Sequence, residues 1–270
     1  ITCRDWSSDV CSSDLLGVDP DRSGPPLETI LFDDLDGYLR YADRQGAPAE
    51  GTAGFYDPGA NRSAFWNAFN DGAVLSYRRK LDLLEESGAL PRARLQQLRR
   101  ALNIEARDAL KMALRHELAH QVQHNIGLLR RDVATPVWLV EGLACLFEVD
   151  PAGARRGLVV NEHRLAHFHR GQAANGLFSL EALMAVQRVD PLMDPQRVEL
   201  FYAQSWALCH YLVRHRPRQM AAYLSDIRSR PPGQTLDPSG EIARFEAVFG
   251  SIQRLERVFF RAMMQMGAKP

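Results

Sequence analysis

Two histidines and a glutamate stand at a spacing that suits metal chemistry. The sequence reads His116-Glu117-Leu118-Ala119-His120. In a helix, four residues advance about 400° and about 6 Å, so both imidazoles point the same way, one turn apart. Such a pair can bind one Zn²⁺, and Glu117 can accept a proton from a metal-activated water. The alternative is a helix with two ordinary histidines, so the metal interpretation needs a third ligand.

Glu141 is the candidate third ligand. It follows His120 by 21 positions and lies in an apolar helical segment beside Trp138, Leu139 and Leu143. Burying a carboxylate among such neighbours is costly unless it is paired or binds a metal. Two histidines and one glutamate leave the fourth tetrahedral position of a zinc ion open for water, as catalysis requires. The alternative is that Glu141 lies on the solvent face of its helix.

At these residues the chain resembles the gluzincin branch of zinc metallopeptidases, the relatives of thermolysin and aminopeptidase N. The closest likeness is to a bacterial peptidase-MA-like family whose role is undefined. It is carried by His116–His120 and by Pro136–Ala144. Weaker matches occur in the expected order along a region from about Leu27 to the C-terminus: Gly54–Tyr56, Val160–Glu162, Tyr202–Leu208 and Phe245…Phe249-Gly250.

The resemblance implies roles for further residues. Gluzincins place a tyrosine or histidine donor beside the oxyanion, and Tyr202 occupies the matching position, although a core tyrosine is an equal alternative. Zincin peptidases bind substrate along a sheet edge, and Gly54, Phe55 and Tyr56 could form that edge. A structural hairpin with aromatic core residues explains the same three residues. Neither the substrate nor endo- versus exopeptidase action follows from the family.

The histidine pair requires a long helix, which we predict from about Asp108 to Ile126. Its apolar stripe consists of Leu110, Leu114, Leu118 and Val122. Gly127 is expected to end it, and Pro136 suits the first turn of the Glu141 helix. His124 continues the spacing, but no glycine breaks the helix before it as in metzincins, so a straight helix carries it away from the metal.

The fold class predicted is α+β and zincin-like, with a small N-terminal sheet and a largely helical C-terminal half. We expect a strand at Leu27–Phe32, a hairpin over 51–66, and a helix over Ala73–Gly88. A separate basic helix should follow Pro91, with its arginines on a solvated face. Further along we expect a short strand at Leu158–Asn161 and helices that begin near Asn161, Ser179, Val198, Gln219, Glu241 and Ile252.

Several other polar residues allow two interpretations. Glu148 could orient a metal ligand, but a surface carboxylate is slightly favoured. His163, His167 and His169 could contact a metal or a polar substrate, but most histidines of this kind are simply solvated. Cys145 and Cys209 are expected to be inert core thiols, and a disulfide between them is left open.

Residues Cys3–Leu15 resemble the translation of a short-read sequencing adaptor, so we treat 1–26 as artefact and linker and 27–270 as one zincin-like domain. The true N-terminus is then expected to be missing, which leaves a signal peptide and an extracytoplasmic location open. Excluding this tract removes one arginine and three aspartates from the count, which leaves 32 basic and 30 acidic residues. Balanced charge argues against nucleic acid as a partner, and no apolar run approaches the length of a membrane-spanning helix.

Two functions remain for this sequence. The first is zinc-dependent hydrolysis of a peptide or protein substrate, with Glu117 as general base. The second is a catalytically silent zincin-fold protein that binds or scaffolds, and an intact Glu117 counts against it because a purely structural site has no use for a base. The oligomeric state is not indicated by the sequence.

Overall fold

The structure, a computed structural model, describes residues 27–47, 49, 51–150, 158–189, 194–235 and 237–267. The adaptor-like tract and the linker to residue 26 lie outside them. The chain divides into two compact units, which we call the N-terminal unit (27–121) and the C-terminal unit (from 122 onward). The described residues combine helices with a small sheet, so the α+β class is confirmed.

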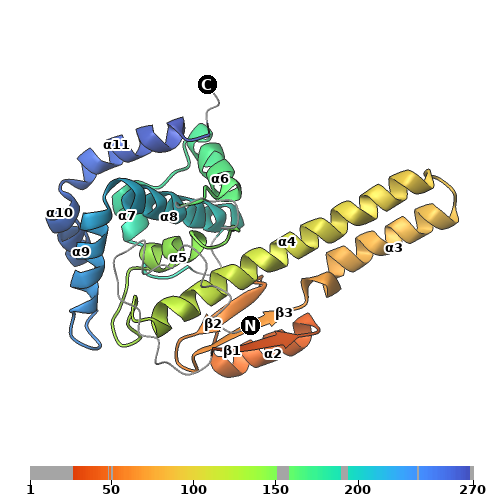
Figure 1. The fold of residues 1–270 in the computed structure, drawn as a ribbon, viewed down its shortest axis with the longest axis horizontal. Coiled ribbons are helices and arrows are strands. Elements are labelled where there is room, and N and C mark those ends of the chain that lie inside the picture. Colours follow the sequence, from red (N-terminus) through yellow and green to blue (C-terminus); the bar gives the residue numbers. More distant parts are fainter. Residues whose placement is uncertain are drawn as a thin grey trace. The chain divides into compact units, whose positions relative to one another are not determined.

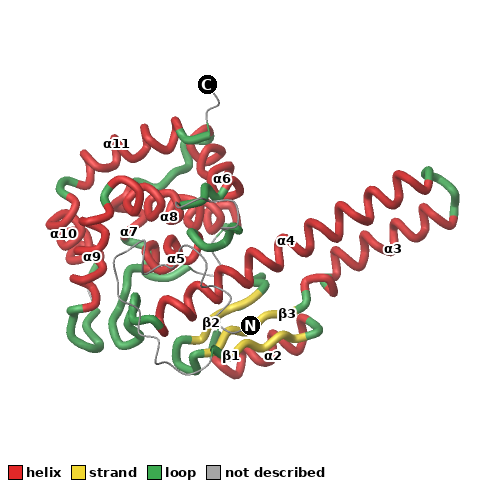
Figure 2. Tube along the Cα trace, in the orientation of Figure 1, coloured by secondary structure: helices red, strands yellow, loops and turns green. Residues whose placement is uncertain are grey.

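The described sheet of the N-terminal unit has three strands, β1 (Glu28–Phe32), β2 (Gly54–Asp57) and β3 (Arg62–Trp66), in the order β1-β3-β2. The predicted hairpin is confirmed, because β2 pairs antiparallel to β3, and β1 pairs parallel to β3 on the other side (Figure 2). The Asp57 carboxylate accepts hydrogen bonds from the backbone N–H groups of Gly59 and Ala60, and Asn61 adopts a φ of 52°. These are the residues that a tight turn favours.

Helix α2 (Leu35–Gln45) covers the sheet and closes a small core. Asp34 caps its first turn by accepting from Gly37 N–H, and Gly46 ends it with a left-handed φ of 65°. Both caps are of the preferred kind. The core residues that are buried in this cluster are Tyr38, Tyr41, Ala42, Ala49, Ala64 and Trp66.

A helical hairpin completes the N-terminal unit. A short 3₁₀ turn, η2 (Ala68–Asn70), leads into α3 (Gly72–Glu86), and α4 (Arg92–Asn125) returns beside it (Figure 1). The prediction of two separate helices after Pro91 is wrong, since α4 is continuous over 34 residues. The reason is visible in the sequence, because this stretch contains neither glycine nor proline to interrupt a helix.

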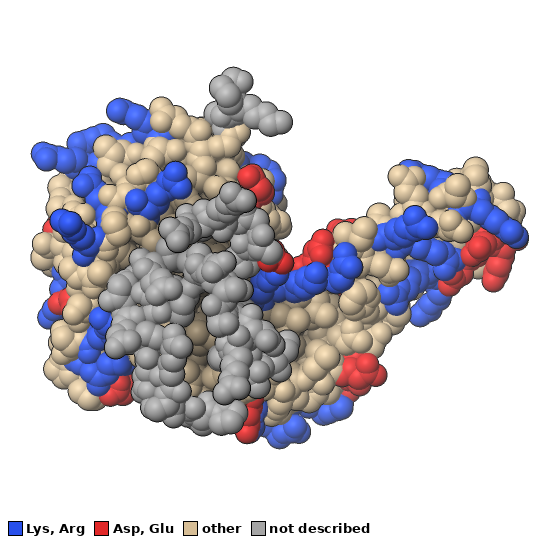
Figure 3. Space-filling view, viewed as in Figure 1, with Lys and Arg blue, Asp and Glu red and all other residues tan. Residues whose placement is uncertain are grey.

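The arginines of the predicted basic helix lie among acidic and polar partners. Arg99 contacts both Asp82 and Glu85 of α3 at 2.7 Å, and Arg78 donates to Asn103 of α4. Figure 3 shows basic and acidic side chains together over this hairpin. Exposed pairs of this kind contribute little stability each, and they describe a solvated helix face.

The C-terminal unit is helical wherever it has regular described structure. The helices after α4 are α5 (Val137–Cys145), α6 (Glu162–Ala173), α7 (Leu180–Met184), α8 (Pro195–His215), α9 (Pro217–Arg228), α10 (Pro238–Phe249) and α11 (Ile252–Gln265). Asn161, Ser179, Asp194, Asp237 and Ser251 each cap a helix through the side chain. The predicted strand at Leu158–Asn161 is wrong: the described chain there has no partner strand and belongs to no helix or sheet.

Helix α8 is the centre of this unit and packs against α5, α6, α9 and α11 (Figure 1). The crossing with α5 is close at Gly142, where a Cβ atom would lie 2.4 Å from the Ser205 carbonyl oxygen. Only glycine permits the two backbones to approach this closely. Gly142 follows Glu141 directly, so the close crossing fixes where α5 presents that carboxylate within the unit. Among the described helices, none is long and apolar enough to cross a membrane.

Candidate metal centre

Helix α4 brings the two predicted histidine ligands together. The Nε2 atoms of His116 and His120 are 3.1 Å apart, and their ring planes are inclined at 83°. Both residues are buried, with 8% and 7% of their surface exposed. The i,i+4 spacing therefore converges two ring nitrogens on one point, as the sequence predicts.

The most buried face of this part of α4 is polar rather than apolar. The predicted stripe of Leu110, Leu114, Leu118 and Val122 is only half-buried, whereas His116, His120, Gln121 and Gln123 are buried. Burial of polar side chains requires partners, and it indicates that this face serves more than packing.

Gln121 anchors the histidine helix to the sheet, a role that sequence reasoning missed. Its amide nitrogen donates to the backbone carbonyls of Glu28 (3.1 Å) and Asn61 (2.8 Å), and its amide oxygen accepts from the Ser63 hydroxyl (3.1 Å). The side chain is fully buried. Because Gln121 is adjacent to His120, these bonds fix the rotation of α4 and hence the direction of both imidazoles.

Replacing Gln121 by leucine should lower the free energy of unfolding by about 2 kcal/mol, because a buried hydroxyl and two partly buried carbonyls lose a partner at roughly 1–3 kcal/mol per unsatisfied buried group. Urea denaturation measures the change. Gln96→Leu is the matched control, since Gln96 is exposed on the same helix. Equal stability of the two variants would show that the anchor is unimportant.

Glu117 lies between the histidines in sequence and interacts with Tyr38 of α2. Burial raises the pKa of Tyr38 to about 12; its hydrogen bond with Thr52 (2.7 Å) lowers the pKa, and the charge of Glu117 adds to the rise. Tyr38 is fully buried and stays protonated at neutral pH. Sequence reasoning gave no signal for this neighbour of the predicted base, because 79 positions separate the two residues in the chain.

Glu141 lies on α5, in the C-terminal unit. It is half-buried, and its helix neighbours Trp138, Leu139 and Leu143 are fully buried. His116 and His120 belong to the N-terminal unit and Glu141 to the C-terminal unit, so the part of Glu141 as third ligand stays a prediction. Within the C-terminal unit, His163, His167 and Glu199 make up a group of three side chains that could hold a metal ion.

His124 and the cysteines have structural surroundings. The Nδ1 atom of His124 lies 3.1 Å from the Leu129 carbonyl oxygen, in the turn that follows α4. This carbonyl is therefore a hydrogen-bond partner of one ring nitrogen. Cys145 and Cys209 are buried and are not joined in a disulfide. Burial raises the pKa of Cys209 well above its ordinary value, and the charge of Cys145 adds to this, so Cys209 is an unreactive thiol at neutral pH.

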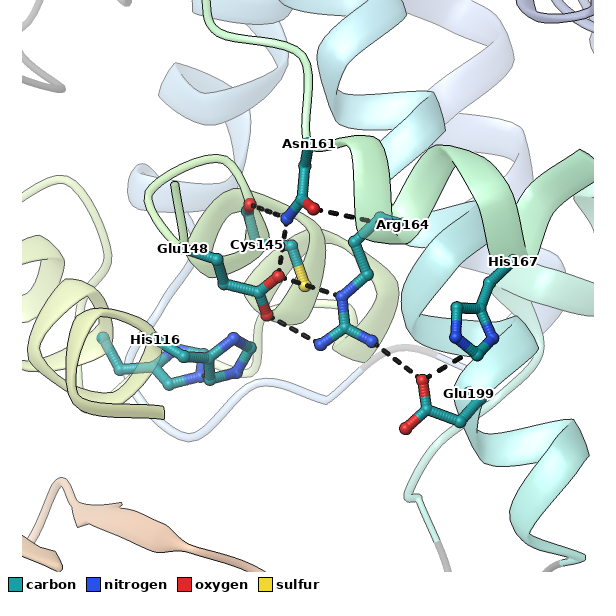
Figure 4. Close-up of polar contacts among 8 residues, drawn as sticks. His116, Cys145, Glu148, Asn161, Arg164, His167 and Glu199 are labelled. Carbon is teal, nitrogen blue, oxygen red and sulfur yellow. Dashed lines mark hydrogen bonds and ion pairs between the residues drawn. The ribbon is translucent and has the colours of Figure 1, made fainter. Parts of the chain in front are cut away.

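Glu148 is the centre of a buried ion-pair network, and its expected position on the surface is wrong. Arg164 of α6 binds both carboxylate oxygens, with Nη2–Oε1 at 2.7 Å and Nε–Oε2 at 2.9 Å. Asn161 donates to the same carboxylate at 2.7 Å, and Arg164 reaches Glu199 of α8 at 3.2 Å (Figure 4). Only 1% of the Glu148 side chain and 8% of the Arg164 side chain are exposed.

Nothing in the sequence singles out Arg164 as the partner of Glu148, because 16 positions separate them. Asn161 was predicted only as a helix cap, and it does cap α6 by accepting from Arg164 N–H at 3.2 Å. The amide nitrogen of Asn161 also donates to Glu148. The Asn161 side chain therefore both caps α6 and holds the Glu148 carboxylate in place. A bidentate arginine with an added amide donor is the arrangement that makes a buried carboxylate tolerable.

Tyr202 lies on α8 beside this network. The Arg164 guanidinium carbon is 5.3 Å from the centre of its ring, a cation–π distance, and Phe201 meets the ring edge-on. The ring is half-buried. These contacts fix the ring of Tyr202 within the C-terminal unit, and its part in an oxyanion site stays a prediction.

The residues predicted to bind substrate lie on β2, which is an edge strand of the described sheet. A Cβ at Gly54 would lie 2.4 Å from the Phe65 ring, Phe55 packs against Tyr38 and Tyr41, and the Tyr56 hydroxyl donates to Asn61. These side chains therefore build the small core and the turn. The binding of a substrate strand along the backbone of β2 stays a prediction.

Residues 111–234 match the family described as "Protein of unknown function (DUF1570)". This region includes His116, Glu117, His120, Glu141 and Tyr202, and it is shorter than half of the chain. No curated protein and no solved structure matches the sequence.

Proposed function

We propose that this protein is a zinc-dependent peptidase of the gluzincin kind. The observation that carries the proposal is the convergence of the His116 and His120 Nε2 atoms to 3.1 Å on one helix whose intervening residue is Glu117. The two imidazoles are buried and meet edge to face, and an acid stands between them in the sequence. A metal site of the HExxH kind accounts for all three residues.

The donor set fits zinc. Two imidazoles and a carboxylate are the ligands of a catalytic zinc with one open position, and His116, His120 and Glu141 would hold the ion. Zinc bound there would supply a water that ionises near neutral pH and would polarise the scissile carbonyl. Half-burial of Glu141 in an apolar helix also supports this assignment, because a ligand carboxylate is compensated there by the cation.

Glu117 would move the protons of the reaction. As a carboxylate it would accept a proton from the attacking water and then deliver it to the leaving amine. Tyr202 would donate its hydroxyl hydrogen bond to the oxyanion, and the contact with Arg164 holds the ring that carries the hydroxyl. The backbone of β2 at Gly54, Phe55 and Tyr56 would bind the substrate as an added strand, which recognises peptides through their main chain.

Metal analysis combined with a mixed peptide library tests this function. The purified chain should contain zinc, lose library cleavage on treatment with a chelator, and regain it when zinc is added back. His120→Ala and Glu141→Gln should each weaken zinc binding by more than about tenfold. Mutating a residue that only supports a metal ligand already costs about that much affinity, so loss of a ligand should cost more. His215→Ala serves as control, because His215 is an exposed histidine of α8.

Two results would contradict the proposal. Cleavage that survives the chelator would exclude metal-dependent hydrolysis. Zinc binding without cleavage of any library member would support the alternative, a zincin-fold protein that binds or scaffolds without catalysis.

A further inference from the structure

A second set of metal-ligand side chains lies at the contact of α6 and α8, wholly within the C-terminal unit. His163 and His167 are four residues apart on α6, with ring centres 4.6 Å apart. Glu199 of α8 approaches them, with its Oε2 atom 3.9 Å from His167 Nδ1. One ligand atom from each residue lies within 4.8 Å of the others. Figure 4 shows His167 and Glu199 facing each other beside Arg164.

The third histidine of α6 provides a contrast. His169 Nε2 lies 3.1 Å from the Met263 carbonyl oxygen, so this imidazole ties α6 to α11. The rings of His163 and His167 instead face each other and Glu199 from a helix surface, and His163 is exposed. A histidine pair at i,i+4 with a carboxylate from a neighbouring helix is the donor arrangement that binds a transition metal.

We propose that His163, His167 and Glu199 form a second cation site, which takes a divalent transition metal such as Zn²⁺ or Ni²⁺ and joins α6 to α8. Bonds of about 2.0–2.1 Å in a tetrahedral site place donor atoms about 3.4 Å apart, so side-chain rotations suffice to close the present spacing. Imidazole donors favour zinc, nickel or copper over Ca²⁺ and Mg²⁺, which prefer oxygen ligands alone. The side chains of His167 and Glu199 are 24% and 47% exposed, so an ion can enter from solvent.

The charges around the site are compatible with a cation. Partial burial lowers the pKa of His167 while the charge of Glu199 raises it, and Arg170, His163 and Arg164 lower it further, so the net shift is downward. Imidazole binds metals in its neutral form. Arg164 is paired with the buried Glu148, so the group of Arg164, Glu148 and Glu199 carries one positive and two negative charges.

Zinc titration by calorimetry tests this site separately from the proposed catalytic one. His163→Ala and His167→Ala should each remove one weaker zinc equivalent, with an affinity loss of about tenfold or more, and should leave the tighter equivalent in place. His215→Ala, an exposed histidine on α8, should leave both equivalents unchanged. Peptide cleavage should be unchanged in all three variants, because none of the altered residues belongs to the proposed catalytic site.

A thermal-shift series provides a second readout. Zinc in excess of the tighter equivalent should raise the melting temperature of the wild-type chain and of His215→Ala, but not of His163→Ala or His167→Ala, since a ligand that binds only the folded state stabilises it. Identical titrations and identical shifts for all four proteins would overturn the second site. That result would leave the peptidase proposal untouched, because the proposed function rests on His116, His120 and Glu141.

Discussion

Replacing Glu117 by glutamine should lower turnover by orders of magnitude while leaving zinc bound. The amide keeps the size of the side chain but cannot accept the proton of the attacking water at neutral pH, so the step that makes the nucleophile loses its base. We expect kcat to fall by about 10²- to 10⁴-fold, the usual contribution of a general base. Steady-state cleavage of a library-derived peptide measures the loss, and elemental analysis measures the retained zinc.

Glu105→Gln is the matched control, because Glu105 is an exposed glutamate of the same helix α4. It should keep both activity and metal. Undiminished hydrolysis by Glu117→Gln would remove Glu117 from the mechanism. If Glu117→Gln loses its zinc as well, the residue supports the site and is not its base.

Arg164→Met should destabilise the C-terminal unit severely. The substitution leaves the Glu148 carboxylate buried with Asn161 as its remaining partner from this network, and breaking a buried ion pair on one side costs about 3–5 kcal/mol. Since domains are stable by only about 5–15 kcal/mol, a large part of the stability is at stake. Denaturant unfolding, followed by circular dichroism, measures the difference.

Arg170→Met provides the comparison, because Arg170 is exposed on the same helix and should change stability little. Adding Glu148→Gln to Arg164→Met should restore part of the loss, since the buried charge that has lost its arginine is then removed. A double variant no more stable than Arg164→Met would mean that the cost lies in packing and not in the buried carboxylate.

Local rules predicted most of the secondary structure. The hairpin of β2 and β3 follows from its turn residues, and the starts of α6 and α7 follow from Asn161 and Ser179. These features depend on residues a few positions apart, which is why the sequence reveals them. The two errors of this kind were a helix break between Arg100 and Asp108, where no breaking residue exists, and a strand at Leu158–Asn161 that no other strand pairs with.

Arrangements that depend on distant residues could not be predicted. The parallel pairing of β1 with β3 joins residues 34 positions apart, such as Glu28 and Arg62. The Gln121 anchor reaches the backbones of Glu28 and Asn61 across 93 and 60 positions. Buried polar groups of this kind are each satisfied by whichever partner the fold provides, and no spacing rule in the sequence encodes the partner.

The sequence by itself determined the direction of the two imidazoles, because a helix repeats every 3.6 residues and His116 and His120 must then share a face. Only the tertiary structure decided that this face is buried, that Gln121 holds its helix against the sheet, and that Glu148 is enclosed by Arg164. The physical reason is that a helical repeat is set by neighbouring peptide units. The partner of a buried charge is set by chain segments that meet only after folding.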